Sequence, residues 1–329
     1  MNYRKLGNSD IEVTELTFGC MSIVNDINSN SQSEKDSIDA IDVSLSEGIN
    51  FFDTAPGYGN GASEVLLGKA LGSRRKDVIV ATKVSGSLKK EDVFRACEKS
   101  LKRLNTDYVD LYQIHWPDWE TPLAETIDAF DRLKTEGKIR WYGVSNFGKE
   151  DLTEALESGN VVTNQMAYNL IWRNIEKELI PICEKENVGI LCYSSMMQGL
   201  LTGKFKTVEE VPEGRARSRH FSKNNRPLAV HQEEGFEKET FEAIDALRSI
   251  SESHHLPMGT LALKWLLAQP AVTSVLVGAR NAQQAKENID AVRSDVLPEA
   301  LSDATEATEP LKSLMGLNLD MWAKGSRIR

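Results

Sequence analysis

Four side chains of different chemical types stand at the ends of apolar runs, or just after them, in the first 115 residues: Asp53, Tyr58, Lys83 and His115. Taken singly, each would more often be a helix cap, a surface charge or a structural ring. Together they could transfer a proton. A tyrosine phenol has a pKa of about 10, and a nearby ammonium favours its ionised form. We therefore predict that Lys83 lowers the pKa of Tyr58.

The other two residues complete a site that acts on a carbonyl group. Asp53 can pair with Lys83 and hold it charged, while His115 can donate a hydrogen bond to the carbonyl oxygen that Tyr58 protonates. The set contains no hydride donor and no obvious nucleophile. The chemistry therefore requires a cofactor that carries a hydride, and no metal site is predicted.

The elements that position these residues alternate regularly between strand and helix. Strands are expected at 16–19, 50–53, 78–83, 108–115, 138–144, 161–165, 188–193 and 272–277. Helices are expected at 33–48, 63–71, 90–104, 122–137, 149–157, 175–186, 236–254, 258–268 and 281–291. Eight such units predict an α/β fold of the (β/α)8 (TIM) barrel type, whose active site forms at the carboxyl ends of the strands. An open doubly wound sheet is the alternative, but no GxGxxG follows the first strand.

Three additions to the barrel are expected within a single domain spanning residues 1–329. They are an N-terminal β-hairpin at 3–13, a long loop at about 200–235 and a C-terminal tail after the helix at 281–291. We also expect Asn174 to cap the helix at 175–186.

Composition excludes several classes of protein. The chain has 39 Lys+Arg against 49 Asp+Glu, a formal net charge of −10, which argues against nucleic acid and anionic membrane surfaces as partners. The start of the sequence has no apolar leader, and no run is long enough to span a membrane. The four cysteines form no CxxC pair and predict reduced thiols in a cytoplasmic protein.

Later strand ends offer groups that suit a nicotinamide cofactor. Ser145, Asn146 and Gln165 could hold a carboxamide, and the ring of Tyr193 could stack on a flat heterocycle. The stretch from Gly278 to Asn281 opens the last predicted helix, where free N–H groups suit a phosphate.

At this point the sequence resembles the aldo-keto reductases. The resemblance spans almost the whole chain and is carried by NFFDTAPGY (50–58), DLYQIHWP (110–117), GKIRWYGVSN (137–146) and GARNAQQAKEN (278–288). DTAPGY together with GVSN is a highly specific pairing. The resemblance implies a (β/α)8 barrel that binds NADP(H) without a Rossmann fold, with Tyr58 as general acid/base among Asp53, Lys83 and His115.

The resemblance also implies a set of cofactor contacts. Near the nicotinamide it implies Gly19, Cys20, Met21, Asp53, Ser145, Asn146, Gln165 and Tyr193. For the pyrophosphate and the adenosine it implies Ser194, Ser195, Gly199, Leu201, Gly278, Arg280, Gln284, Glu287 and Asn288. Gln284 replaces an arginine that grips the 2′-phosphate in many members, so Arg280 or the basic loop around Arg217 is expected to take that role. NAD(H) stays an alternative to NADP(H).

The expected activity is reduction of a small-molecule aldehyde or ketone to an alcohol by hydride transfer, with a sugar or sugar-derived carbonyl as one candidate substrate. Tyr58, His115, Trp116 and Trp172 are expected to contact the substrate. The alternative is a regulatory subunit that senses NADP(H), because potassium-channel β-subunits also resemble this family. The oligomeric state is not predicted.

Overall fold

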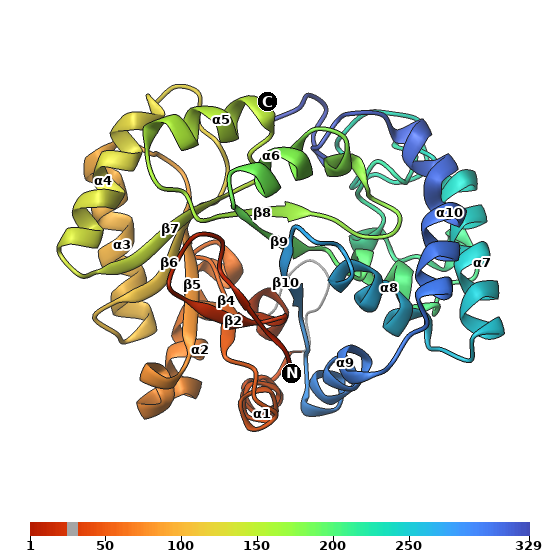
Figure 1. The fold of residues 1–329 in the computed structure, drawn as a ribbon, viewed down its shortest axis with the longest axis horizontal. Helices are drawn as coiled ribbons and strands as arrows, with labels where there is room; N and C mark the ends of the chain where they lie inside the picture. Colours follow the sequence, from red (N-terminus) through yellow and green to blue (C-terminus); the bar gives the residue numbers. More distant parts are fainter. Residues whose placement is uncertain (25–31) are drawn as a thin grey trace.

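The computed structural model describes residues 1–24 and 32–329, and its centre is a closed barrel of eight parallel strands (Figure 1). The order around the barrel is β10-β3-β4-β5-β6-β7-β8-β9. The bounds are β3 Leu16–Gly19, β4 Phe51–Asp53, β5 Ile79–Val84, β6 Val109–Ile114, β7 Ile139–Ser145, β8 Thr163–Ala167, β9 Gly189–Tyr193 and β10 Val272–Val277. The predicted barrel and its eight strands are confirmed.

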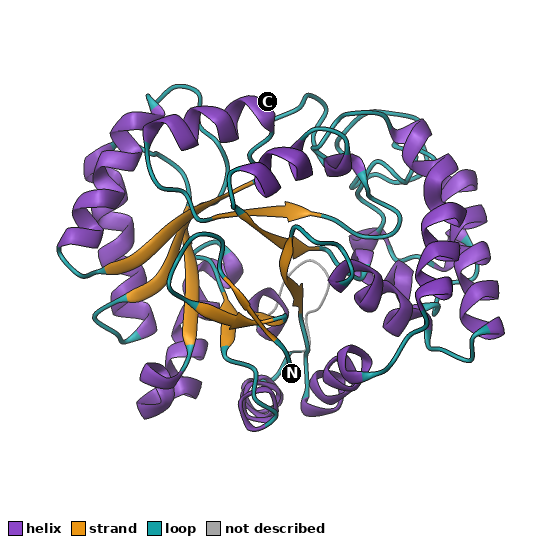
Figure 2. Ribbon diagram, viewed as in Figure 1, coloured by secondary structure: helices purple, strands orange, loops and turns teal. Residues whose placement is uncertain are grey.

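Helices surround the barrel because their apolar stripes pack against the outward faces of the strands (Figure 2). Their bounds are α1 Glu34–Ser46, α2 Ala62–Leu71, α3 Lys90–Leu104, α4 Leu123–Thr135, α5 Lys149–Ser158, α6 Leu179–Lys185, α7 Glu237–Ser253, α8 Met258–Leu267, α9 Ala282–Arg293 and α10 Pro298–Met315. Among the described residues, no helix combines the length and the apolar composition needed to cross a membrane.

The N-terminal hairpin closes the amino-terminal end of the barrel. Its strands, β1 Tyr3–Lys5 and β2 Glu12–Thr14, pair antiparallel. Leu6, Ile11 and Val13 are buried against inward-facing barrel residues that include Phe51 and Leu111. The hairpin thus fills one end with apolar side chains, and the polar residues gather at the other end.

The strand register places these polar residues side by side at the same end of the barrel. Gly19 pairs with Asp53, Lys83 with Gln113, and Ser145 with Gln165. Because all barrel strands run parallel, these residues meet at the carboxyl edge, as the sequence predicts.

Two sequence-based expectations about the helices are wrong. The chain after α9 is not only a tail, because α10 Pro298–Met315 follows and packs beside α7 (Figure 1). Asn174 does not cap a helix: it begins a 3-10 turn, and α6 starts only at Leu179. Pro181 has no N–H and fits only the first turn of a helix. The Asn174 side chain instead donates to the carbonyl of Asn318 over 2.8 Å.

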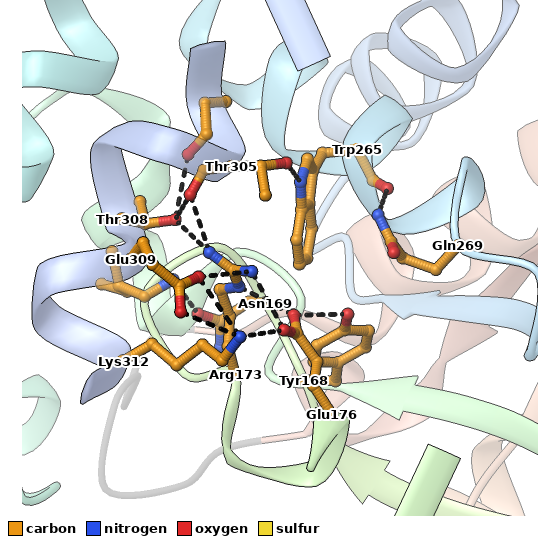
Figure 3. Close-up of polar contacts among 12 residues, drawn as sticks. Tyr168, Asn169, Arg173, Glu176, Trp265, Gln269, Thr305, Thr308, Glu309 and Lys312 are labelled. Atoms are coloured by element: carbon orange, nitrogen blue, oxygen red, sulfur yellow. Dashed lines mark hydrogen bonds and ion pairs between the residues drawn. The ribbon is translucent and has the colours of Figure 1, made fainter. Parts of the chain in front are cut away.

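A polar network joins α10 to the segment that follows β8 (Figure 3). Arg173, which is 4% exposed, donates to both carboxylate oxygens of Glu176 over 2.7 and 2.9 Å. It also donates to the Thr305 carbonyl and the Thr308 hydroxyl. Lys312 pairs with Oε2 of the same carboxylate over 2.8 Å. Because buried charges need such partners, this network fixes α10 on the barrel.

We therefore expect Arg173→Ala to lower the free energy of unfolding by about 3 kcal/mol, because it removes the buried guanidinium that links Glu176 to the Thr305 carbonyl and the Thr308 hydroxyl of α10. Urea unfolding of the purified protein measures the change. Lys185→Ala is the matched control, since Lys185 is exposed and forms a surface pair with Glu186. Equal midpoints for the two variants would contradict the role given to the network.

Candidate active site

The centre of the site is a fully buried ion pair between Lys83 and Asp53. The Lys83 ammonium donates to Asp53 Oδ1 over 2.6 Å and to the Thr54 carbonyl over 2.9 Å, and the side chains are 0% and 2% exposed. Burial alone would lower the pKa of Lys83, but the negative charge of Asp53 and the Tyr58 hydroxyl raise it. Lys83 is therefore a cation inside the barrel.

Two glutamines complete the surroundings of Asp53. The second carboxylate oxygen accepts from Gln165 Nε2 over 2.9 Å and from Gln113 Nε2 over 3.2 Å. Gln113 was missed by the sequence analysis, although it lies within the motif DLYQIHWP and faces the barrel interior two residues before His115. The alternation of inward and outward residues along β6 was the signal that could have found it.

Tyr58 is held at the mouth by the loop after β4. Its backbone N–H donates to the Ala55 carbonyl over 3.1 Å, and it begins a 3-10 turn that ends at Gly61. Gly61 has φ of 90°, and a Cβ there would lie 2.7 Å from Arg103 Cδ. Any other residue at this position would strain the backbone of the turn that carries Tyr58 and would force the Arg103 side chain to shift.

The phenol of Tyr58 lies next to Lys83 as predicted, but its pKa is not lowered overall. The Lys83 ammonium lies 5.3 Å from the ring centre and interacts with the hydroxyl. Burial raises the pKa of Tyr58, and this effect outweighs the lowering by Lys83, much of whose charge is balanced by Asp53. The prediction of a lowered pKa is therefore wrong, and Tyr58 is protonated at neutral pH.

His115 faces Tyr58 across the mouth. The two ring centres are 6.1 Å apart, and the rings are nearly perpendicular, at 86°. Burial and the charge of Lys83 lower the pKa of His115 to about 3, so its ring is neutral at physiological pH. Its Nδ1 lies 2.9 Å from the hydroxyl of Ser85, a residue that the sequence analysis missed.

The residues expected around a nicotinamide carboxamide form one connected group. The Tyr193 hydroxyl donates to Asn146 Oδ1 over 2.7 Å, and Asn146 Nδ2 donates to Ser145 Oγ over 3.1 Å. Asn146 Nδ2 also donates to the His115 carbonyl over 3.0 Å. Gln165 is tied to the same group, because Ser145 Oγ donates to its carbonyl over 2.9 Å. The structure therefore brings all four predicted residues together.

Positive charge gathers beside the turn after β9. A Cβ on Gly199, where φ is 94°, would lie 2.7 Å from Lys204 Nζ and 2.9 Å from Arg215 Nη1. Burial and the charges of Arg215 and Arg280 lower the pKa of Lys204 to about 8. Like charges held together in this way favour an anion between them. Gly199 and Arg280 were predicted here, whereas Lys204 was not identified as a site residue.

The other residues expected near the nicotinamide and the pyrophosphate differ in their placement. Gly19 ends β3, Cys20 is buried, and Met21 is 42% exposed. Ser195 is buried and donates to the Leu276 carbonyl over 2.6 Å, so its hydroxyl joins two strand ends. Ser194 has φ of 54° and its carbonyl accepts from Asn169 Nδ2, whereas Leu201 is buried in the core within the turn that contains Gly199.

The predicted adenosine residues lie at the start of α9. Gln284 Oε1 accepts from the backbone N–H of Arg280 over 3.0 Å, and Asn288 Nδ2 donates to the Gly278 carbonyl over 3.3 Å. Glu287 is exposed and accepts from Gln283. Gln284 therefore binds the backbone of its own turn. Arg280 remains the cation at this end of the site for which contact with the 2′-phosphate is predicted.

Of the two tryptophans expected at the substrate, the structure brings one to the mouth. Trp116 follows His115 and is half-buried beneath the guanidinium of Arg327. Trp172 is 1% exposed and packs against the ring of His220, so it belongs to the core and the predicted substrate contact is wrong. Arg217 lies over Trp322, with its guanidinium 5.6 Å from the ring centre, and its Nε donates to the Gly214 carbonyl.

The donor set fits a nicotinamide dinucleotide. Amide and hydroxyl groups gather at the ends of β7, β8 and β9, and three cations gather beside Gly199, where phosphates would be stabilised. Between these groups lie a protonated phenol and a neutral imidazole, which can together protonate and orient a carbonyl oxygen.

Comparisons with known proteins agree with this geometry. The model of the aldo/keto reductase family matches residues 15–308. The aldo-keto reductase YhdN of Bacillus subtilis is 36% identical over 296 residues, 86% of each chain. An NADH-specific methylglyoxal reductase of Escherichia coli is 32% identical, over 92% of this chain and 98% of that one.

A solved structure extends the likeness to the fold. The holo form of aldo-keto reductase AKR11C1 from Bacillus halodurans superposes with a TM-score of 0.76 at 32% identity, over 94% of this chain and 96% of that chain. Family, relatives and fold agree over nearly the whole length. The chain belongs to the aldo/keto reductase family, and it is an NAD(P)H-dependent oxidoreductase that acts on carbonyl groups of small molecules.

Proposed function

We propose that this protein reduces an aldehyde or ketone to an alcohol, with NADPH as the preferred reductant and Tyr58 as the proton donor. The observation that carries the proposal is the buried Lys83–Asp53 pair beside a phenol that is protonated at neutral pH. The four cysteines are free and buried, which supports a cytoplasmic location.

Each residue of the site has a distinct part in the reaction. NADPH, when bound, would supply the hydride for the carbonyl carbon. The neutral ring of His115 donates a hydrogen bond from Nε2 to the carbonyl oxygen when Ser85 donates to Nδ1. Tyr58 transfers its proton to the same oxygen, and Lys83 stabilises the phenolate that is left behind. Asp53 holds Lys83 in place for this step.

The cations beside Gly199 support the choice of coenzyme. We infer that Arg280 contacts the 2′-phosphate of NADP(H), while Lys204 and Arg215 neutralise further phosphate charge. Asn146 and Gln165 hold the carboxamide, and the ring of Tyr193 forms the face on which the nicotinamide stacks. The hydrogen bonds of Tyr193 to Asn146 and of Gln165 to Asp53 support this assignment, because they hold the three side chains at the mouth.

We expect Tyr58→Phe to lower kcat for carbonyl reduction by about 10²–10⁴-fold, because it removes the acid and leaves the ring. Stopped-flow absorbance of the reduced nicotinamide measures the rate. Fluorescence titration should show NADPH binding close to that of the unsubstituted protein. Reduction by the Tyr58→Phe variant at the unsubstituted rate would remove Tyr58 from the mechanism. If the unsubstituted protein binds NADPH but reduces no aldehyde, the regulatory alternative is favoured.

The pH dependence of reduction follows from the protonation of the two groups. Tyr58 must be protonated and His115 neutral, and burial raises the pKa of Tyr58 while the pKa of His115 is lowered to about 3. The active forms therefore coexist from mildly acid pH upward, and activity is lost only as Tyr58 ionises in strong alkali. We expect kcat/KM to be flat between about pH 5 and 8. An inflection near pH 6.5 that disappears in His115→Asn would contradict this account.

Coenzyme choice is tested at Arg280. We expect Arg280→Met to weaken NADPH binding about tenfold or more and to change NADH binding little, because only NADPH carries the 2′-phosphate. Lys286→Met is the matched control, because it removes a cation from the same helix that pairs with Glu47 and Asp290, and little change is expected for either coenzyme. Equal losses for NADPH and NADH would show that Arg280 contacts a shared phosphate instead.

A further inference from the structure

An arginine from the C-terminal tail covers one wall of the mouth. The guanidinium carbon of Arg327 lies 3.7 Å from the centre of the Trp116 ring, the residue directly after His115. The side chain of Arg327 is 46% exposed, so a small molecule in the mouth can reach it. The segment after α10 thus returns to the barrel and places a cation next to the candidate catalytic residues.

Only one edge of this guanidinium is occupied. Nε donates to Asp320 Oδ2 over 2.7 Å, and Nη2 donates to Oδ1 over 3.0 Å. Nη1 forms no hydrogen bond to any residue in 1–24 or 32–329, so the edge formed by Nη1 and Nη2 keeps N–H groups for a second partner. A guanidinium fork of this kind matches a carboxylate or a phosphate.

The anchor of Arg327 is a buried carboxylate with several hydrogen-bond donors. The Asp320 side chain is fully buried and also accepts from the backbone N–H groups of Trp322 and Ala323, over 3.0 and 3.2 Å. Arg219 donates to the Asp320 and Ala323 carbonyls, both over 2.6 Å. Arg327 is therefore held in one position before any ligand arrives, which reduces the entropy lost on binding.

The tail also contacts the opposite wall of the mouth. The Trp322 side chain interacts with Tyr193, whose hydroxyl is bonded to Asn146. The charge of Arg327 acts on the same phenol, because it opposes the effect of burial on the pKa of Tyr193. Arg327 is thus close to both Trp116 and Tyr193, which flank the entrance to the site.

We propose that the open edge of Arg327 binds a carboxylate or phosphate group of the substrate, at the end remote from the carbonyl that is reduced. This inference rests on the proposed function, because it assigns the substrate class of the same site: carbonyl compounds that carry an anionic group. Trp116 supplies an apolar face between that group and the carbonyl.

The experiment compares matched aldehydes with wild-type protein and Arg327→Met, which keeps an unbranched side chain on Trp116. One pair is 4-carboxybenzaldehyde and 4-nitrobenzaldehyde; the other is glyceraldehyde 3-phosphate and glyceraldehyde. We expect wild type to prefer the anionic member of at least one pair, and Arg327→Met to reduce that preference in kcat/KM about tenfold or more, mainly through KM. The pair that responds identifies carboxylate or phosphate.

Further variants separate recognition from tail stability. Arg329→Met is the matched control, because Arg329 also anchors the tail, through Asp151 and over the Trp119 ring, but lies away from Trp116. It should leave the preference unchanged. Arg327→Lys keeps the charge and loses the fork, so an intermediate preference is expected. If Arg327→Met does not fold, salt still tests the proposal, since screening should weaken the anionic preference of wild type.

The role of Arg327 and the proposed reductase function would fail in different ways. Reduction of the neutral aldehydes with no preference for the anionic ones, or a preference that Arg327→Met leaves intact, overturns the role of Arg327 alone. No reduction of any of the four aldehydes with NADPH or NADH overturns the proposed function, and the assignment of Arg327 falls with it.

Discussion

The burial of one positive charge is the constraint on which the rest of the site depends. Lys83 is fully enclosed in the barrel, where an ammonium without partners would cost several kcal/mol. Asp53 and the Thr54 carbonyl offset that cost, and Gln113 and Gln165 bind the other oxygen of Asp53. Lys83 and Asp53 lie on the neighbouring strands β5 and β4, whereas Gln113 and Gln165 come from β6 and β8, so the full set of partners forms only when these strands are brought together in the barrel.

The same charge sets the protonation of its neighbours. It adds to the effect of burial on His115, whose pKa falls to about 3, and it partly offsets the effect of burial on Tyr58. The mouth therefore presents a neutral hydrogen-bond donor and a protonated acid at physiological pH. Both groups already face the mouth in the protonation states that a carbonyl oxygen requires. The site is preorganised in this sense.

The sequence predicted the barrel well because two signals agree in it. Apolar runs alternate with amphipathic helices, and the polar residues of the site fall where those runs end. The net pKa of Tyr58 could not be predicted, because it depends on how closely the chain packs around the phenol. Trp172 was misplaced for a similar reason, since its sequence position does not reveal that the 200–235 loop buries it against His220.

The C-terminal region was the part least predictable from local patterns. The helix α10 is anchored through Arg173, and the tail through Asp320 and Arg219, by contacts between residues more than 100 positions apart. Pro310 within α10 and polar residues on its buried side, such as Thr308, also weaken the helical signal. These long-range contacts hold the tail on the mouth and give Arg327 its place beside Trp116.

The central claim is that Lys83 acts through Tyr58. A double-mutant cycle in single-turnover reduction tests it most directly, with Lys83→Met, Tyr58→Phe and the double variant compared with wild type. The account predicts that the double variant is about as slow as the slower single variant, because the phenolate that Lys83 stabilises no longer forms. Losses that multiply would show that the two residues act independently and would contradict the account.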